Sequence, residues 1–109
     1  KTYHRSCGLG PWIVLGASES EARSWTISIK IDRGAKTVFN GETGVDQIKR
    51  TFPELAGYLF RCQRFEHGAV LLTGTGIVPA DDFTLATGDS VSITISGIGT
   101  LQNPVEIVD

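Results

Sequence analysis

The chain has 109 residues, with 10 Lys and Arg against 12 Asp and Glu and a formal net charge of -2. This length fits a single domain that buries roughly two-thirds of the surface of its unfolded form. The near-neutral charge and the lack of a basic run argue against a nucleic-acid partner. The longest apolar stretches, residues 12–15 and 69–72, are far shorter than the ~20 residues that cross a bilayer, so we expect no membrane span.

The cysteines indicate the cellular compartment of the protein, and the first residue indicates whether the chain is a fragment. Cys7 and Cys62 lie far apart without a C-x-x-C pairing, so neither a disulfide framework nor a zinc site is indicated. We expect both to be small core or near-core side chains in a cytoplasmic protein. The chain opens on Lys1 without methionine, signal region or polar lead-in, which predicts that residues 1–109 are a single-domain fragment of a longer protein.

The first regular elements predicted are two strands. Residues 24–32 place Trp25 and three isoleucines on one face and polar side chains on the other, which is the pattern of a half-buried strand. Asp32-Arg33-Gly34 supplies a turn, and residues 36–40 form a second strand that Asn40-Gly41 closes. This segment therefore predicts a hairpin.

An amphipathic helix is predicted next, from an apolar stripe at intervals of three or four residues. Thr51, three residues before Glu54, resembles a capping box and places Pro53 in the first turn, so the helix begins near Thr51. Glu66-His67-Gly68 ends the helical region. The stripe consists of Val45, Ile48, Phe52, Leu55 and Leu59.

The last third of the chain predicts further strands. Residues 69–73 are continuously apolar, as in a central strand buried on both faces. Residues 91–96 alternate cleanly after a Gly88-Asp89 turn, glycines at 97 and 99 end that strand, and residues 105–108 offer a short final one. The predicted class is a β-rich α+β fold with one main amphipathic helix.

The strongest candidate for a ligand site is the Gly74-Thr75-Gly76 turn, directly after the predicted central strand. It presents backbone N–H groups and one hydroxyl, and its glycines allow close approach of a carboxylate or phosphate. Glycine-rich turns after strands are more often structural, and this one is neither a P-loop nor a G-x-G-x-x-G motif. Arg5 and Lys1, near the turn at residues 8–11, also offer positive charge to an anion, with surface solubility as an equally good explanation.

Other polar groups carry weaker signals. Glu19-Ser20-Glu21 resembles a metal-ligand pair but lies in a polar stretch, which favours a solvated loop. Asp81-Asp82, just beyond a proline, is more readily explained as an exposed loop than as a proton or cation site. His4 and His67 lack partners at ligand or catalytic spacing and are predicted to be ordinary loop histidines.

Taken in order, a set of segments resembles the C-terminal half of the catalytic domain of the fumarylacetoacetate hydrolase family. The resemblance runs along nearly the whole chain, and the order and spacing of its segments are more specific than any one of them. The segments are Lys1-Thr2-Tyr3, residues 6–11, residues 40–43, Leu55 with Tyr58-Leu59, residues 71–76, Gly88-Asp89 and residues 97–105.

This resemblance implies a mixed β-sandwich roll, usually dimeric, with Mg²⁺ or Mn²⁺ at the 2-oxo-carboxylate end of a substrate, where the ion stabilises an enolate. It implies that Lys1 is the catalytic lysine beside the metal. Thr75, with Gly74, contacts the substrate carboxylate, while Gly10 and Pro11 shape the wall of the site. The family's metal-binding Glu-x-Glu pair and later Asp belong upstream of Lys1, and residues 19–21 lie on the wrong side of that lysine to replace them.

Within the family, residues 74–79 followed by Phe83-Thr84-Leu85 resemble the sugar-acid branch, which includes 2-keto-3-deoxy-D-arabinonate dehydratase. The implied reaction eliminates water from a 2-keto-3-deoxy sugar acid, with Lys1 assisting proton movement near C3 or acting electrostatically. Two alternatives stay open: an acylpyruvate-type carbon–carbon bond hydrolase, and a non-catalytic dimerisation module. We expect the isolated 109 residues to be inactive.

Overall fold

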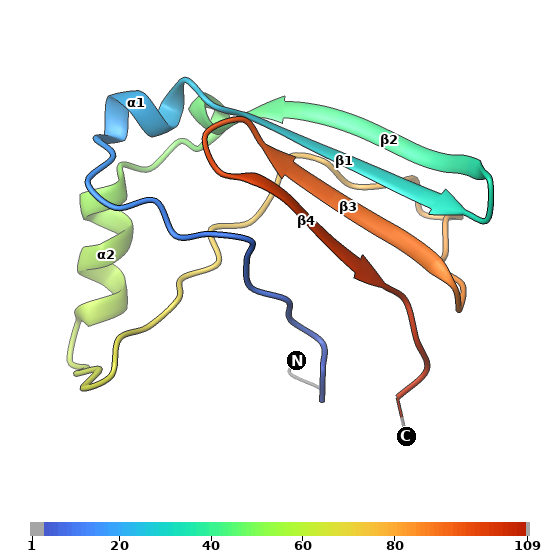
Figure 1. Cartoon of the computed structure of the whole chain (residues 1–109). Helices are drawn as coiled ribbons and strands as arrows, with labels where there is room; N and C mark the ends of the chain where they lie inside the picture. The colour runs from blue at the N-terminus through green and yellow to red at the C-terminus, as the bar shows by residue number, and fades with distance from the viewer. Residues whose placement is uncertain (1–3, 109) are drawn as a thin grey trace.

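The computed structural model describes residues 4–108 and contains one sheet and one main helix (Figure 1). The four strands are ordered β2-β1-β3-β4, and each neighbouring pair is antiparallel. The predicted β-rich α+β class is therefore confirmed. The elements are α1 (Glu19–Arg23), β1 (Thr26–Arg33), β2 (Lys36–Gly44), the 3-10 turn η1 (Val45–Gln47), α2 (Phe52–Phe60), β3 (Asp89–Ile95) and β4 (Gly99–Pro104).

Isoleucine side chains that alternate along β1 form the centre of the sheet. Ile27, Ile29 and Ile31 are paired with Ile95, Ile93 and Val91 of β3 in the antiparallel register. Ile31 is only 3% exposed, and Ile27 and Ile29 are half-buried, so the half-buried strand predicted from alternation is confirmed. Cross-strand apolar pairs of this kind are the main source of sheet stability.

The predicted hairpin is confirmed, but its second strand is longer than expected. β2 continues to Gly44, and Asn40 and Gly41 are paired with Lys30 and Ile29 of β1 rather than forming a turn. A Cβ on Gly41 would lie 2.7 Å from Cγ2 of Ile77. Glycine is thus present because another segment packs closely on the strand, a reason that the local sequence pattern does not reveal.

The C-terminal strand was predicted too late in the sequence. Residues 105–108 are not a strand; the edge strand is β4, which pairs with β3 from Gly99 to Pro104. Gly97 lies in the turn between the two strands, and Gly99 is the first residue of β4, with a φ of 119° that favours glycine. A side chain at Gly97 would also collide with the Trp25 indole. The glycines therefore reverse the chain instead of ending the sheet.

The prediction of a strand at residues 69–73 is wrong. This segment has no regular structure and crosses below the sheet in Figure 1, with Val70 and Leu72 exposed to 64% and 70%. An apolar run indicates a tendency to be buried, but a strand also needs a neighbour for its hydrogen bonds. The four strands of the described sheet do not include one beside this segment.

The main helix begins where the capping pattern predicted. The Thr51 hydroxyl accepts a hydrogen bond from the Glu54 N–H at 3.2 Å, and Pro53 lies in the first turn. The helix ends at Phe60, six residues before the expected Glu66, because the backbone of Arg61 is extended and that of Cys62 is left-handed. Val45 belongs to the separate turn η1, so the apolar stripe spans two elements.

Removal of the cap is a direct test of this helix boundary. Thr51→Ala in the full-length protein is expected to lower the free energy of unfolding by about 1 kcal/mol, because the Glu54 N–H loses its acceptor. Thr51→Ser, which keeps the hydroxyl, is the matched control. Urea unfolding curves measure both, and an equal loss in the two variants would contradict the capping role.

The described surface is large for a chain of this size. The accessible area is 8636 Å², against about 5900 Å² for a typical folded monomer of this mass. Both cysteines are exposed, so the prediction that they lie in or near the core is wrong. None of the helices within residues 4–108 has the length and apolar character that a bilayer crossing requires. The sheet thus has too few covering elements here to bury more of the chain.

Candidate functional site

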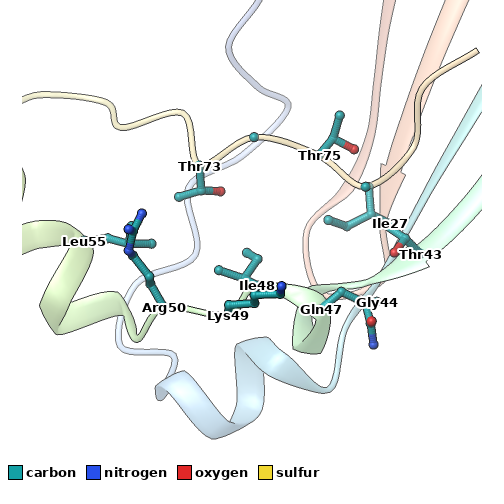
Figure 2. A pocket seen from close by; sticks show the side chains of 12 residues that line it. Ile27, Thr43, Gly44, Gln47, Ile48, Lys49, Arg50, Leu55, Thr73 and Thr75 are labelled. Atoms are coloured by element: carbon teal, nitrogen blue, oxygen red, sulfur yellow. The ribbon is translucent and has the colours of Figure 1, made fainter.

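A cleft of about 560 Å³ lies between the segment after residue 72 and the chain around the start of α2 (Figure 2). One wall is residues 73–76. The opposite wall consists of residues 47–50 and Leu55, and the end of the hairpin, at Ile27 and residues 43–44, closes one side. The cleft therefore brings the predicted Gly74-Thr75 turn opposite a region that the sequence analysis treated only as helix.

Thr75 presents a hydroxyl at this cleft. Its oxygen accepts a hydrogen bond from the Ile77 N–H at 3.1 Å, which leaves the O–H free to be donated elsewhere. Gly74 has a φ of 85°, a left-handed conformation that favours glycine. The turn is thereby fixed by its own backbone chemistry while its hydroxyl proton stays available to an anion.

The opposite wall carries two cations, Lys49 and Arg50, which we call the cationic wall. Arg50 forms an exposed ion pair with Glu54 at 3.5 Å and lies 5.9 Å from the centroid of the Tyr58 ring. Among the described residues, Lys49 has no hydrogen bond or ion pair that would neutralise it. Sequence reasoning missed both residues, although adjacent cations just before a helix cap are a recognisable signal for an anion site.

The cleft contains only some of the residues predicted for the site. Gly74 and Thr75 line it, whereas Gly10 and Pro11 do not. These two lie against the last hairpin of the sheet: a Cβ on Gly10 would be 3.5 Å from Leu101 Cδ1, and Pro11 Cγ is equally near the Cβ position of Gly99. The predicted catalytic residue Lys1 lies outside the described residues, so its role stays a prediction.

The described residues offer no ligand set for a metal ion. Within residues 4–108, no three His, Cys, Asp or Glu side chains gather closely enough to hold one. The prediction that residues 19–21 form a solvated loop is wrong, because Ser18 caps a short helix there and Glu19 accepts a 2.8 Å hydrogen bond from Arg23. These residues do not fit a metal, and we derive no chemical step through one.

The remaining candidate residues are placed at the surface. His4 and His67 lie in exposed turns, as predicted, and residues 81–82 form another exposed turn. Arg5 pairs with Glu106 at 3.2 Å in a solvent-exposed contact. None of these groups lines the cleft.

An ion pair with a buried carboxylate lies apart from the cleft, where β3 begins. Asp89 is 0% exposed and accepts hydrogen bonds at 2.8 Å from Nε and Nη2 of Arg33 and from the Ala86 N–H. The Arg33 guanidinium, followed by the Ala86 N–H, lowers the pKa of Asp89 to about 2. Arg33 also donates to the Thr84 carbonyl, so the pair ties the hairpin to the loop before β3.

Residues 1–106 match the sequence profile of the family described as Fumarylacetoacetate (FAA) hydrolase C-terminal. The chain belongs to this family. Over 108 residues it is 37% identical to a probable 2-keto-3-deoxyxylonate dehydratase of Haloferax volcanii, covering 99% of this chain and 37% of that protein. It is 39% identical over 106 residues to the 2-dehydro-3-deoxy-D-arabinonate dehydratase of Saccharolobus solfataricus, covering 97% of this chain and 36% of that one.

A solved structure supports the same assignment. It is a 2-keto-3-deoxy-D-arabinonate dehydratase complexed with magnesium and 2,5-dioxopentanoate, which matches with a TM-score of 0.74 and 40% identity. The match covers 77% of this chain and 30% of that one. The chain thus spans a little over a third of the length of the curated relatives it matches. The resemblance to the sugar-acid branch and the expected family fold are confirmed.

Proposed function

We propose that this chain is the C-terminal part of an enzyme that dehydrates a 2-keto-3-deoxy sugar acid. The observation that carries the proposal is the alignment of nearly the whole chain with two relatives named for such dehydrations. The cleft is chemically consistent with it, because a 2-oxo acid is an anion and Thr75, Lys49 and Arg50 all favour a carboxylate. The proposal concerns the longer protein, of which these residues supply one part of the site.

The chain's own residues have separate tasks in this proposal. The Thr75 hydroxyl donates to the substrate carboxylate, Gly74 lets the substrate approach the backbone, and Gly10 with Pro11 shapes a wall of the complete site that lies outside this cleft. Dehydration removes a proton from C3, next to the ketone, so that a hydroxyl on the adjacent carbon can leave as water. Lys1 assists that proton movement or stabilises negative charge electrostatically.

We extend the proposal to a divalent cation, Mg²⁺ or Mn²⁺. The solved neighbour contains magnesium, and a hard cation bound to oxygen ligands neutralises charge that develops beside a ketone. Since the described residues do not provide a fitting ligand set, we propose that the ligands lie upstream of Lys1 in the longer protein.

The same reasoning extends to assembly. We propose a homodimer whose subunits each combine this segment with the N-terminal part of the same protein. Support comes from the large accessible area and from exposed apolar side chains such as Trp12 and Ile13. We propose a cytoplasmic location, because the two free cysteines are exposed and a reducing compartment keeps them unpaired.

An assay of the full-length protein tests the proposed function. With Mg²⁺ we expect dehydration of a 2-keto-3-deoxy sugar acid, loss of turnover with EDTA, and no turnover by the 109-residue segment alone. Release of pyruvate from an acylpyruvate without sugar-acid dehydration would instead identify a carbon–carbon bond hydrolase. If neither reaction occurs and Mg²⁺ with oxalate leaves the melting temperature unchanged, the chain is an assembly module.

A further inference from the structure

Arg23, the last residue of α1, makes an unusually complete set of contacts at the cationic wall. Its Nη1 donates to the Ile48 carbonyl at 2.7 Å, and its Nη2 donates to the Arg50 carbonyl at 2.8 Å. Nε donates to Glu19 at 2.8 Å, and the guanidinium lies 5.2 Å from the centroid of the Phe52 ring. The side chain is only 24% exposed, so these contacts are partly shielded from water.

The two carbonyls that Arg23 binds flank Lys49. A planar guanidinium with two donors in fixed directions holds two acceptors in one relative orientation, which an ammonium group does not do. Arg23, which belongs to α1, therefore fixes the backbone on both sides of Lys49. This connection between η1 and α2 has few other anchors: the Ile48 N–H bonds to Val45, and the Thr51 cap begins the helix.

The separation of the two cleft walls depends on this connection. Residues 73–76 form one wall, and the segment bound by Arg23 forms the other. Figure 2 shows Arg50 extending from the start of α2 toward the segment that carries Thr73. A shift of residues 48–50 would move both cations relative to the Thr75 hydroxyl.

We propose that Arg23 is a positioning residue for substrate binding, which holds Lys49 and Arg50 where they and Thr75 contact the same anionic substrate. This inference rests on the proposed function. It assigns Arg23 no contact with the substrate, since each of its three nitrogens already donates to Glu19 or to one of the two carbonyls.

A purely structural role for Arg23 is the competing explanation, and Arg33 provides a matched control. Arg33 is also an arginine that binds one carboxylate, Asp89, and one carbonyl, that of Thr84. It lies at the other end of β1 and does not line the cleft. Loss of Arg33 contacts is therefore expected to lower the melting temperature without changing substrate binding.

The experiment compares Arg23→Gln, Arg23→Lys, Arg33→Lys and Lys49→Gln in the full-length protein. We expect Arg23→Gln to raise KM about tenfold with kcat within about twofold of wild type, because a misplaced wall weakens binding more than chemistry. For Arg23→Lys we expect a KM that remains raised, by more than half of the Arg23→Gln effect on a logarithmic scale. For Arg33→Lys we expect a KM within about twofold of wild type. In the double variant, Arg23→Gln is expected to add a smaller rise in KM to Lys49→Gln than it causes alone, because Arg50 is then the only cation of the cationic wall left to misplace.

Unchanged KM in Arg23→Gln and Arg23→Lys would overturn the inference, as would an equal rise in KM in Arg33→Lys. If Arg23→Gln does not fold, the KM values of Arg23→Lys and of the double variant Arg23→Lys with Lys49→Gln test the inference instead. Calorimetric binding of oxalate with Mg²⁺ to the same variants gives a second readout, with binding about tenfold weaker expected for Arg23→Gln. A wild-type protein that binds oxalate but dehydrates no sugar acid would contradict the proposed function while leaving the Arg23 comparison valid.

Discussion

Thr75→Val in the full-length protein is expected to raise KM between about tenfold and a hundredfold. Valine keeps the shape of the side chain but removes the hydroxyl that we propose donates to the substrate carboxylate, and hydrogen bonds to charged groups contribute about 1.5–3 kcal/mol. The same change removes the acceptor for the Ile77 N–H, so the turn loses one internal bond. Steady-state kinetics on a 2-keto-3-deoxy sugar acid measures the effect.

Thr75→Ser separates the two consequences of that substitution. Serine keeps a hydroxyl that can accept from the Ile77 N–H and still donate to the substrate. Its KM is expected to stay close to that of wild type. If serine and valine raise KM equally, the hydroxyl does not contact the substrate; if both leave KM unchanged, the turn does not belong to the binding site.

Asp89→Asn is expected to have the largest effect on stability. Asp89 is fully buried and accepts three hydrogen bonds, two of them from Arg33. The amide introduced by Asp89→Asn cannot accept both hydrogen bonds from the Arg33 guanidinium, and Arg33 is left without the buried negative charge that it pairs with. We expect the melting temperature to fall by about 5 °C or more, measured by calorimetry. Asp81→Asn, in an exposed turn, is the control and is expected to leave it unchanged.

The same carboxylate predicts a pH dependence. The pKa of Asp89 is held at about 2 in the folded state, below its ordinary value of 3.8 in the unfolded chain. A lowered pKa means that the folded state favours the charged form, so this stabilisation is present above pH 3.8 and is lost as the pH falls toward 2. Melting temperatures from pH 5 to 2 should therefore fall less steeply in Asp89→Asn than in wild type. Equal slopes would contradict the assignment.

Local patterns predicted the elements whose causes are local. The alternation around Ile29 predicted β1, and the Thr51–Glu54 spacing predicted the start of α2. The errors have non-local causes. The glycine at position 41 accommodates Ile77 from a distant loop, and residues 69–73 lack a neighbouring strand within the described sheet. Such information is absent from any short window of sequence.

The residues of the candidate site also divide into those that local sequence signals predict and those that only the fold reveals. The turn with Thr75 was predicted, because glycines around a hydroxyl are a local signal and the family resemblance identified this position. The role of Arg23 was not, since its two carbonyl acceptors lie 25 and 27 residues further along the chain. Only the fold brings α1 against the connection before α2 and so reveals how Lys49 is held.

The contact between Ile77 and the glycine at position 41 gives the hairpin influence over the turn that carries Thr75. Ile77 is bonded through its N–H to Thr75, and a Cβ at position 41 would lie 2.7 Å from its side chain. A larger residue at position 41 must therefore displace the Ile77 side chain, and we expect the bonded Thr75 hydroxyl to shift with it. Natural variation at position 41 thus has a route to altered substrate preference that leaves every residue of the Gly74-Thr75-Gly76 turn unchanged.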